Sequence, residues 1–171
     1  MKFQFALFVS AAATVCAAPA AKASIEIRDY PGLDNTQSRY ALAIIERAKA
    51  EDVGSLGCVT AIATALTESD LYMCANYAVP ASIGMAHDNV GADQDSVGLF
   101  QQRAVFYTDI SCTMDPGCSA GLFFNDMKAV GNWRGMGAAA LAQAIQRSEI
   151  PDAYGKYVSL ATDVCNSSGQ F

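Results

Sequence analysis

One glutamate near the end of an apolar stretch is the residue of this sequence best suited to chemistry. In residues 57–69, GCVTAIATALTES, Val59, Ile62 and Leu66 recur at helical spacing and predict a helix with one core-facing stripe. Glu68 falls on a different stripe, of alanine and threonine, where a carboxyl group is poorly solvated and its pKa rises. An acid that keeps its proton near neutral pH can serve as the general acid of glycoside cleavage. The alternative is an ordinary solvated glutamate in a last helical turn.

The elements that must position this glutamate are mostly helical. Apolar periodicity predicts five helices, which begin near residue 36 (capped by Asp34 or Asn35), at 57, near 117, at 138 and near 153. Residues 70–95 lose the periodicity and are expected to form a long loop, and residues 96–101 are an apolar run too short to assign. The pattern predicts a mainly α fold, α+β at most.

Length and composition favour one globular domain. The chain has 171 residues, of which 52% are apolar and 16% charged, so it can bury a sizeable core and is not of the disordered class.

The N-terminus has the pattern of a secretory signal peptide over residues 1–23. Lys2 precedes an apolar run over residues 3–15, and residues 21–23, AKA, form a cleavage site. The run is too short to span a membrane, and no other candidate follows. We therefore expect a secreted protein without a membrane partner, with an extended lead-in over residues 24–35 and one domain over residues 36–171.

The charge balance argues against nucleic acid as a partner. Signal removal takes away Lys2 and Lys22 and no acid, so the formal charge changes from −6 to −8. An acidic surface without a basic stripe repels phosphate backbones. If the substrate is anionic, local contacts must recognise it.

Five cysteines remain after signal removal, and secretion favours disulfides for them. Cys112 and Cys118 bracket a turn sequence, so we pair them. A second bridge is expected between two of the other three, and we favour Cys58–Cys165, with Cys74 left over. Without a Cys-x-x-Cys spacing, and with one histidine, no metal site is expected, and nothing suggests an organic cofactor.

Two motifs, in order, resemble the lysozyme-like superfamily of goose-type lysozymes and soluble lytic transglycosylases. There a helix ends in Glu-Ser and a Gly-Leu-Met-Gln segment follows; here Glu68-Ser69 and residues 98–101, GLFQ, match. The longer pattern ALxES…DSVGLFQQR and residues 146–154, QRSEIPDAY, are also similar to secreted actinobacterial proteins thought to share this fold. The resemblance covers roughly residues 36–165 and implies a lysozyme-like domain with a long active-site loop.

The resemblance implies a monomeric muramidase that hydrolyses the β-1,4 bond between N-acetylmuramic acid and N-acetylglucosamine in bacterial peptidoglycan. Glu68 would protonate the leaving oxygen, and the segment from Gly98 would line the sugar groove. Glycine admits close backbone approach, and glutamine side chains can both donate to and accept from sugar hydroxyl and N-acetyl groups. The expected substrate-binding residues are Ser69, Gly98, Gln101, Gln102, Arg103 and Gln146. Gln102 and Arg103 could equally be solvated loop residues.

One position departs from the transglycosylase pattern. Those enzymes carry Ala-Tyr-Asn on a later helix, where this chain has residues 144–146, AIQ. No tyrosine is then expected to position the glycan, and Gln146 would substitute for it. The departure weakens the transglycosylase assignment and leaves the fold expectation unchanged.

A second carboxylate decides between hydrolysis and transglycosylation. Inverting hydrolysis uses one about 6.5–9.5 Å from the acid, to activate water. Goose-type lysozymes carry an aspartate shortly before the glycine segment, and Asp93 and Asp95 occupy that neighbourhood here. We favour Asp93, because Asp95 can instead fix the turn through local hydrogen bonds. The sequence therefore favours hydrolysis, with lytic transglycosylation as the alternative.

Two other function classes compete. A thiol peptidase could use Cys58 at a helix N-terminus with His87, the sole histidine, as its base. A non-catalytic glycan-binding or effector protein could have the same fold, since fold does not fix function. Its sugars could stack on the aromatic residues Tyr72, Tyr77, Tyr107 and Trp133, although such residues more often pack in a core.

Overall fold

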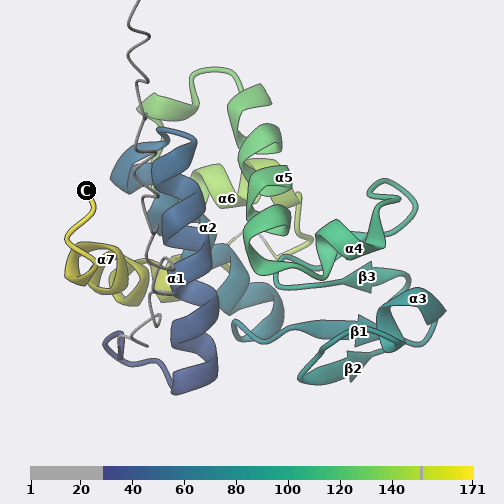
Figure 1. Cartoon of the computed structure of the whole chain (residues 1–171). Helices are drawn as coiled ribbons and strands as arrows, with labels where there is room; N and C mark the ends of the chain where they lie inside the picture. Colours follow the sequence, from purple (N-terminus) through teal and green to yellow (C-terminus); the bar gives the residue numbers. More distant parts are fainter. Residues whose placement is uncertain (1–28, 151) are drawn as a thin grey trace, which may run out of the picture.

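The computed structural model describes residues 29–150 and 152–171, and this part of the chain is mainly helical, with helices packed around α2 and short strands at one side (Figure 1). The α-helices are α1 (Asn35–Ala50), α2 (Gly54–Ser69), α3 (Pro80–Ile83), α4 (Ile110–Thr113), α5 (Pro116–Ala129), α6 (Ala138–Gln146) and α7 (Val158–Ser167). The strands are β1 (Cys74–Asn76), β2 (Asn89–Gly91), β3 (Ser96–Val97) and β4 (Gln102–Arg103). Short 3₁₀ turns precede α6 and α7. The predicted mainly α class is confirmed. The predicted signal peptide and residues 24–28 of the lead-in lie outside the described residues.

Helix α2 is the centre of the domain. It packs against α1, α5, α6 and α7, and every residue from Gly57 to Leu66 is buried. The expectation of a single core-facing stripe is therefore wrong. The helix has no charged residue before Glu68, so it can be enclosed on all sides. Its threonines satisfy their hydroxyls within the helix, as when Thr64 donates to the carbonyl of Thr60 at 2.7 Å.

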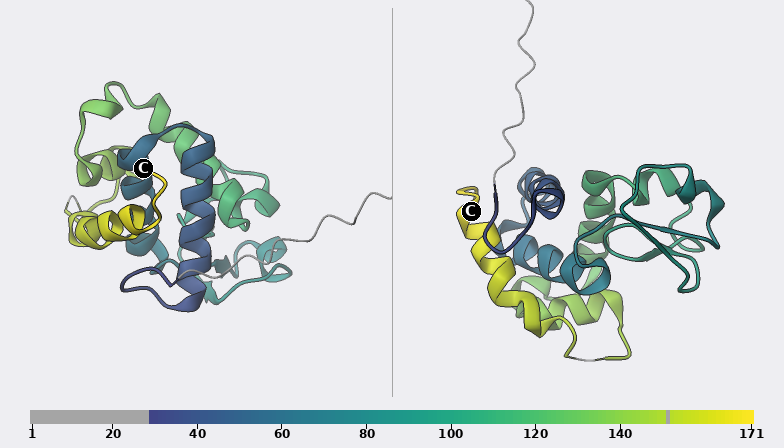
Figure 2. Two further views of the ribbon diagram at one scale, coloured as in Figure 1. Left: turned by 60° about the vertical axis from the view of Figure 1, so that its left-hand side comes forward. Right: turned by 90° about the horizontal axis from the view of Figure 1, so that it is seen from below.

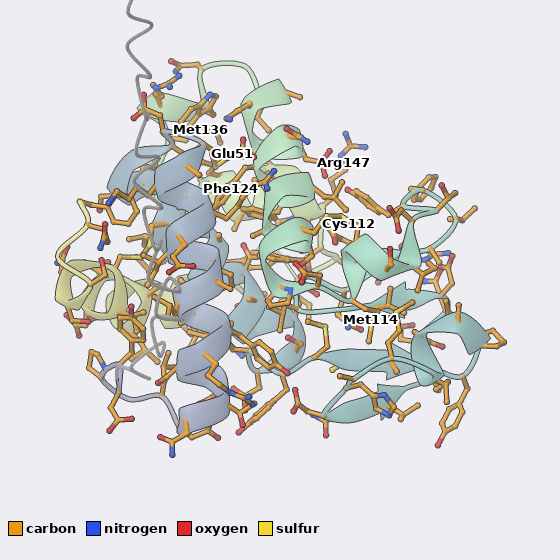
Figure 3. The ribbon with its side chains drawn as sticks, viewed as in Figure 1. Glu51, Cys112, Met114, Phe124, Met136 and Arg147 are labelled. Carbon is orange, nitrogen blue, oxygen red and sulfur yellow. A yellow bond between two sulfur atoms is a disulfide. The ribbon has the colours of Figure 1, made fainter. Side chains whose placement is uncertain are left out.

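Helices α1 and α5 begin where their caps predict, whereas the last helix, expected near residue 153, begins at Val158. Asp34 caps α1 in a reciprocal pair with Gln37, and Asp115 accepts from the backbone N–H of Cys118 at the start of α5. Phe124 of α5 is fully buried and lies between α1 and α5 (Figure 3). The helix count exceeds the expected five because α3 and α4, of four residues each, are too short to show a periodicity.

Residues 71–109, which we call the β region, contain the four strands and the short helix α3 and lie to one side of α1, α2 and α7 (Figures 1 and 2). Strands β1 and β2 pair in parallel, with Cys74 opposite Asn89. The expectation of an unstructured loop over residues 70–95 is therefore wrong. Strands of three residues leave no alternating pattern in a sequence, and they form only through pairing across an intervening segment.

Strands β3 and β4 form a small antiparallel hairpin around the segment Gly98–Gln101. Gly98 has a φ of +78°, and a Cβ there would lie 2.2 Å from the carbonyl oxygen of Thr113. Its N–H donates to the carbonyl of Cys74 at 2.8 Å, which fastens the hairpin to β1. Glycine is therefore required here by backbone geometry and by packing.

Both predicted disulfides are confirmed. Cys58–Cys165 joins α2 to α7, and Cys112–Cys118 joins α4 to α5. Cys74 remains a free, half-buried thiol, also as predicted. Within residues 29–150 and 152–171, none of the helices has the length and apolarity needed to cross a bilayer.

Candidate active site

Glu68 lies in the last turn of α2, where the chain leaves the core. Asp70 and Leu71 both adopt left-handed backbone conformations, so the helix stops abruptly after Ser69. The Glu68 side chain is half-buried, and this burial raises the pKa of its carboxyl above the usual glutamate range. A raised pKa is what a general acid requires.

Tyr154 holds the Glu68 carboxyl in place. Its hydroxyl donates to Oε1 of Glu68 at 2.5 Å, across 86 residues of sequence. This hydrogen bond stabilises the carboxylate and partly offsets the effect of burial on the pKa of Glu68. Burial, and then the bond to Glu68, raise the pKa of Tyr154 well above its ordinary value, so the phenol stays a donor.

A tyrosine that the comparison with the family's later helix did not predict lies beside Glu68. Tyr154 is the last residue of the motif QRSEIPDAY, which carried part of the resemblance. It comes from the segment between α6 and α7, after the helix on which the family's tyrosine is expected. The motif was visible in the sequence, but no periodicity or spacing placed its final residue beside Glu68.

Ser69 connects the end of α2 to the hairpin segment. Its hydroxyl hydrogen bonds to the carbonyls of Ala65, at 3.1 Å, and of Leu99, at 2.8 Å. The side-chain amide of Gln146, at the end of α6, donates to the carbonyl of Phe100 at 2.9 Å. The two predicted motifs are thus in direct contact, and Gln146 binds the same hairpin segment. Ser69 acts here as a structural link.

A cleft of about 510 Å³ lies where the hairpin, α5 and α6 meet. Its walls carry four of the predicted substrate-binding residues, Gln101, Gln102, Arg103 and Gln146. Glu68 does not line this cleft; the two are linked through the hairpin segment, in which Leu99 accepts from Ser69 and Gln101 lines the cleft. Gln101 has a φ of +48°, and its side-chain amide donates a hydrogen bond to the carbonyl of Gly98 at 2.9 Å.

Gln102 and Arg103 are not free, solvated side chains. Gln102 is only 5% exposed and donates to the carbonyl of Ser119 at 3.2 Å. Arg103 is half-buried and forms an ion pair with Asp95. Both residues line the cleft, but Arg103 brings its charge there already neutralised.

The two candidate aspartates have different environments. Asp95 accepts from Arg103 and, at 2.7 Å, from the N–H of Val105, and the Arg103 guanidinium lowers the pKa of that carboxyl. These contacts fix the hairpin. Asp93 is exposed; its backbone carbonyl accepts from Asn76, and its carboxylate has no protein hydrogen-bond partner within the described residues. No hydrogen bond joins either aspartate to Glu68 in that part of the chain.

The alternative of a thiol peptidase lacks its nucleophile, because Cys58 is in a disulfide and has no thiol.

The aromatic residues considered for sugar stacking divide between core and surface. Trp133 is buried under the guanidinium of Arg134, Tyr72 donates to Asp34, and Tyr77 is 72% exposed on the β region. Only Tyr107, which donates to Asp126, lines the cleft.

No known family model matches this sequence, and no curated protein matches it either. Among residues 29–150 and 152–171, no group of three or more histidine, cysteine, aspartate or glutamate side chains could hold a metal ion. We therefore infer the function from the geometry around Glu68.

Proposed function

We propose that the protein is a lysozyme-like muramidase, which hydrolyses the β-1,4 glycosidic bond of bacterial peptidoglycan with Glu68 as its general acid. One observation carries the proposal: a half-buried carboxyl with a raised pKa ends the central helix, and its neighbour Ser69 bonds the hairpin segment that borders a cleft. A raised pKa favours the protonated form that glycoside cleavage needs, and the groove bordered by the hairpin segment could hold the glycan.

The hydrogen bond from Tyr154 orients the acid. Because the phenol occupies Oε1, the proton of Glu68 belongs on Oε2, which would face the glycosidic oxygen. In the reaction the C1–O4 bond breaks as Oε2 gives its proton to the departing oxygen. Tyr154 then stabilises the new carboxylate. Water adds to C1 and loses a proton to a second carboxylate, for which exposed Asp93 is the candidate, since Asp95 is occupied by Arg103.

Lytic transglycosylation is the second candidate, and two observations favour it. Tyr154 supplies a tyrosine next to the acid, and the ion pair with Arg103 withdraws one of the two aspartates from catalysis. In this reaction no water is needed, because the 6-hydroxyl of the muramoyl residue attacks C1. The same Glu68 would take up the proton of that hydroxyl.

The masses of the products distinguish these options. Purified bacterial walls incubated with the full chain are expected to release fragments with reducing ends. Fragments with 1,6-anhydro ends, lighter by one water, would assign transglycosylation to the same site. If the protein binds walls but releases no fragments, it is a non-catalytic glycan-binding protein and the proposal is wrong.

A further inference from the structure

A short motif on the last helix plays no part in the site around Glu68. Residues 166–168 read Asn-Ser-Ser, which matches the acceptor sequence of N-linked glycosylation, Asn-x-Ser/Thr with no proline in the middle. Neither serine nor threonine stands two positions after any other asparagine of the chain, namely Asn35, Asn76, Asn89, Asn125 and Asn132. Because so short a motif also arises by chance, its setting in the fold decides whether it can carry a sugar.

The acceptor side chain faces solvent. Asn166 lies in the last turn of α7, is exposed, and makes no side-chain hydrogen bond within the described residues. An oligosaccharide on its Nδ2 would therefore displace no protein contact. Such a modification is bulky and soluble, and it needs a surface position of this kind.

The position of Asn166 also keeps an attached sugar away from the candidate active site. Helix α7 lies on the side of the molecule opposite the β region (Figure 1). The preceding residue, Cys165, is bonded to Cys58 near the start of α2, whereas Glu68 lies in the last turn of that helix. About 15 Å of helix lies between Cys58 and Glu68. Modification at Asn166 should therefore leave both the acid and the cleft open.

The third residue of the motif, in contrast, is enclosed by the fold. Ser168 is 3% exposed; its hydroxyl donates to the carbonyl of Cys165 at 2.5 Å and accepts from the N–H of Gln170 at 3.2 Å. An enzyme that recognises this hydroxyl can reach it only before the end of α7 has formed. Cys165 is itself fully buried, so closing its bridge to Cys58 fixes the motif in the folded helix.

We propose that Asn166 carries an N-linked oligosaccharide, which is attached before the Cys58–Cys165 bridge closes. The inference is independent of the muramidase function and depends on the export expected from residues 1–23. The donor is an oligosaccharide carried on a lipid pyrophosphate. A bond forms between Nδ2 of Asn166 and C1 of the first sugar, and the C1–O bond to the pyrophosphate breaks. The pyrophosphate leaves with the electron pair, and Nδ2 loses a proton to a base of the transferase.

The mass of the full chain secreted from eukaryotic cells tests the acceptor. We expect the mass of the polypeptide without residues 1–23 plus one oligosaccharide, which a peptide-N-glycosidase removes with conversion of the asparagine to aspartate. Asn166→Gln should lose this glycosidase-sensitive mass completely. The matched control is Asn35→Gln, which changes an exposed asparagine outside any such motif and should keep it. Secretion of the disulfide-bonded chain without this mass, or its retention in Asn166→Gln, overturns the proposal.

The order of events is tested with membranes that contain the transferase and its lipid-linked donor. The acceptor is the unglycosylated chain in two forms, one folded with both bridges closed and one reduced, alkylated and unfolded. We expect transfer to the unfolded form and none to the folded form, in which Ser168 is buried. Equal transfer to both forms would contradict attachment before folding, and transfer to neither would contradict Asn166 as the acceptor.

Discussion

Glu68 and Tyr154 form a pair whose two influences on the acid oppose each other. Burial disfavours the carboxylate and the tyrosine hydrogen bond favours it; burial prevails, because the pKa of Glu68 is raised overall. Without burial the group would be ionised at neutral pH and could not donate a proton. Without the tyrosine, the carboxylate formed by proton transfer would lack its protein donor. Burial therefore favours the protonated acid, and the hydrogen bond from Tyr154 stabilises its conjugate base.

Replacing Tyr154 by Phe is expected to move the pH profile in a defined direction. Activity that needs protonated Glu68 falls as pH rises through its pKa. The hydrogen bond from Tyr154 lowers that pKa, so its loss should raise the pKa and shift the alkaline limb of kcat/KM to higher pH. The maximal kcat should fall about tenfold or more, because the conjugate base loses its donor. The measurement is the rate of wall cleavage from pH 4 to 9.

A control for this change is Tyr77→Phe, which alters an exposed tyrosine on the β region. It should leave the profile in place. A Tyr154→Phe profile shifted to lower pH, or unshifted, would show that the hydroxyl does not act on the protonation of Glu68.

At the scale of elements, the hairpin β3–β4 determines where the cleft lies relative to α2. Gly98 packs against the carbonyl of Thr113, and its N–H donates to the carbonyl of Cys74 in β1. The carbonyl of the next residue, Leu99, accepts from the hydroxyl of Ser69. The segment is thus fixed from three directions. These contacts add to the pairing of its two-residue strands.

Gly98→Ala is expected to destabilise the protein by about 3 kcal/mol or more, since it adds left-handed strain to a backbone clash. Gly131→Ala is the matched control: a Cβ at Gly131 meets no atom within 4 Å, and its φ is not in the left-handed range. Chemical denaturation of both variants gives the two free energies of unfolding. Similar small losses for both would mean that the hairpin can move away from Thr113.

Local signals in the sequence predicted the elements that local interactions form. The caps of α1 and α5, the end of α2 at Glu68-Ser69 and the Cys112–Cys118 bridge follow from residues within one or two turns. The features that the sequence did not predict depend on partners distant in the chain. The parallel strand pair, the burial of α2 on every side and the contact between Tyr154 and Glu68 are of this kind. Their residues carry no short-range pattern that would reveal them.

On the scale of the whole molecule, two disulfides close loops of very different length. Cys58–Cys165 spans 107 residues and ties the central helix to the last one, whereas Cys112–Cys118 spans 6. In the chain-entropy description, a longer closed loop restricts the unfolded chain more strongly. The Cys58–Cys165 bridge should therefore contribute more to stability than the Cys112–Cys118 bridge.

Replacing Cys58 and Cys165 by Ala is expected to cost about 5 kcal/mol, compared with about 2 kcal/mol for the same change at Cys112 and Cys118. Both cysteines of the first bridge are fully buried, so lost packing adds to its cost. The measurement is the free energy of unfolding in denaturant under non-reducing conditions. An equal cost for both double variants would contradict the loop-length argument.

The rate of wall cleavage by Glu68→Gln tests the central claim most directly. The glutamine keeps the shape of the side chain and an oxygen for Tyr154, but it cannot donate a proton as a carboxylic acid does. Glu46→Gln, an exposed glutamate of α1, is the matched control. We expect Glu68→Gln to lower the rate at least about a hundredfold with an unchanged melting temperature, and Glu46→Gln to cleave at the wild-type rate. Near-wild-type cleavage by folded Glu68→Gln would contradict the assignment of Glu68 as the general acid.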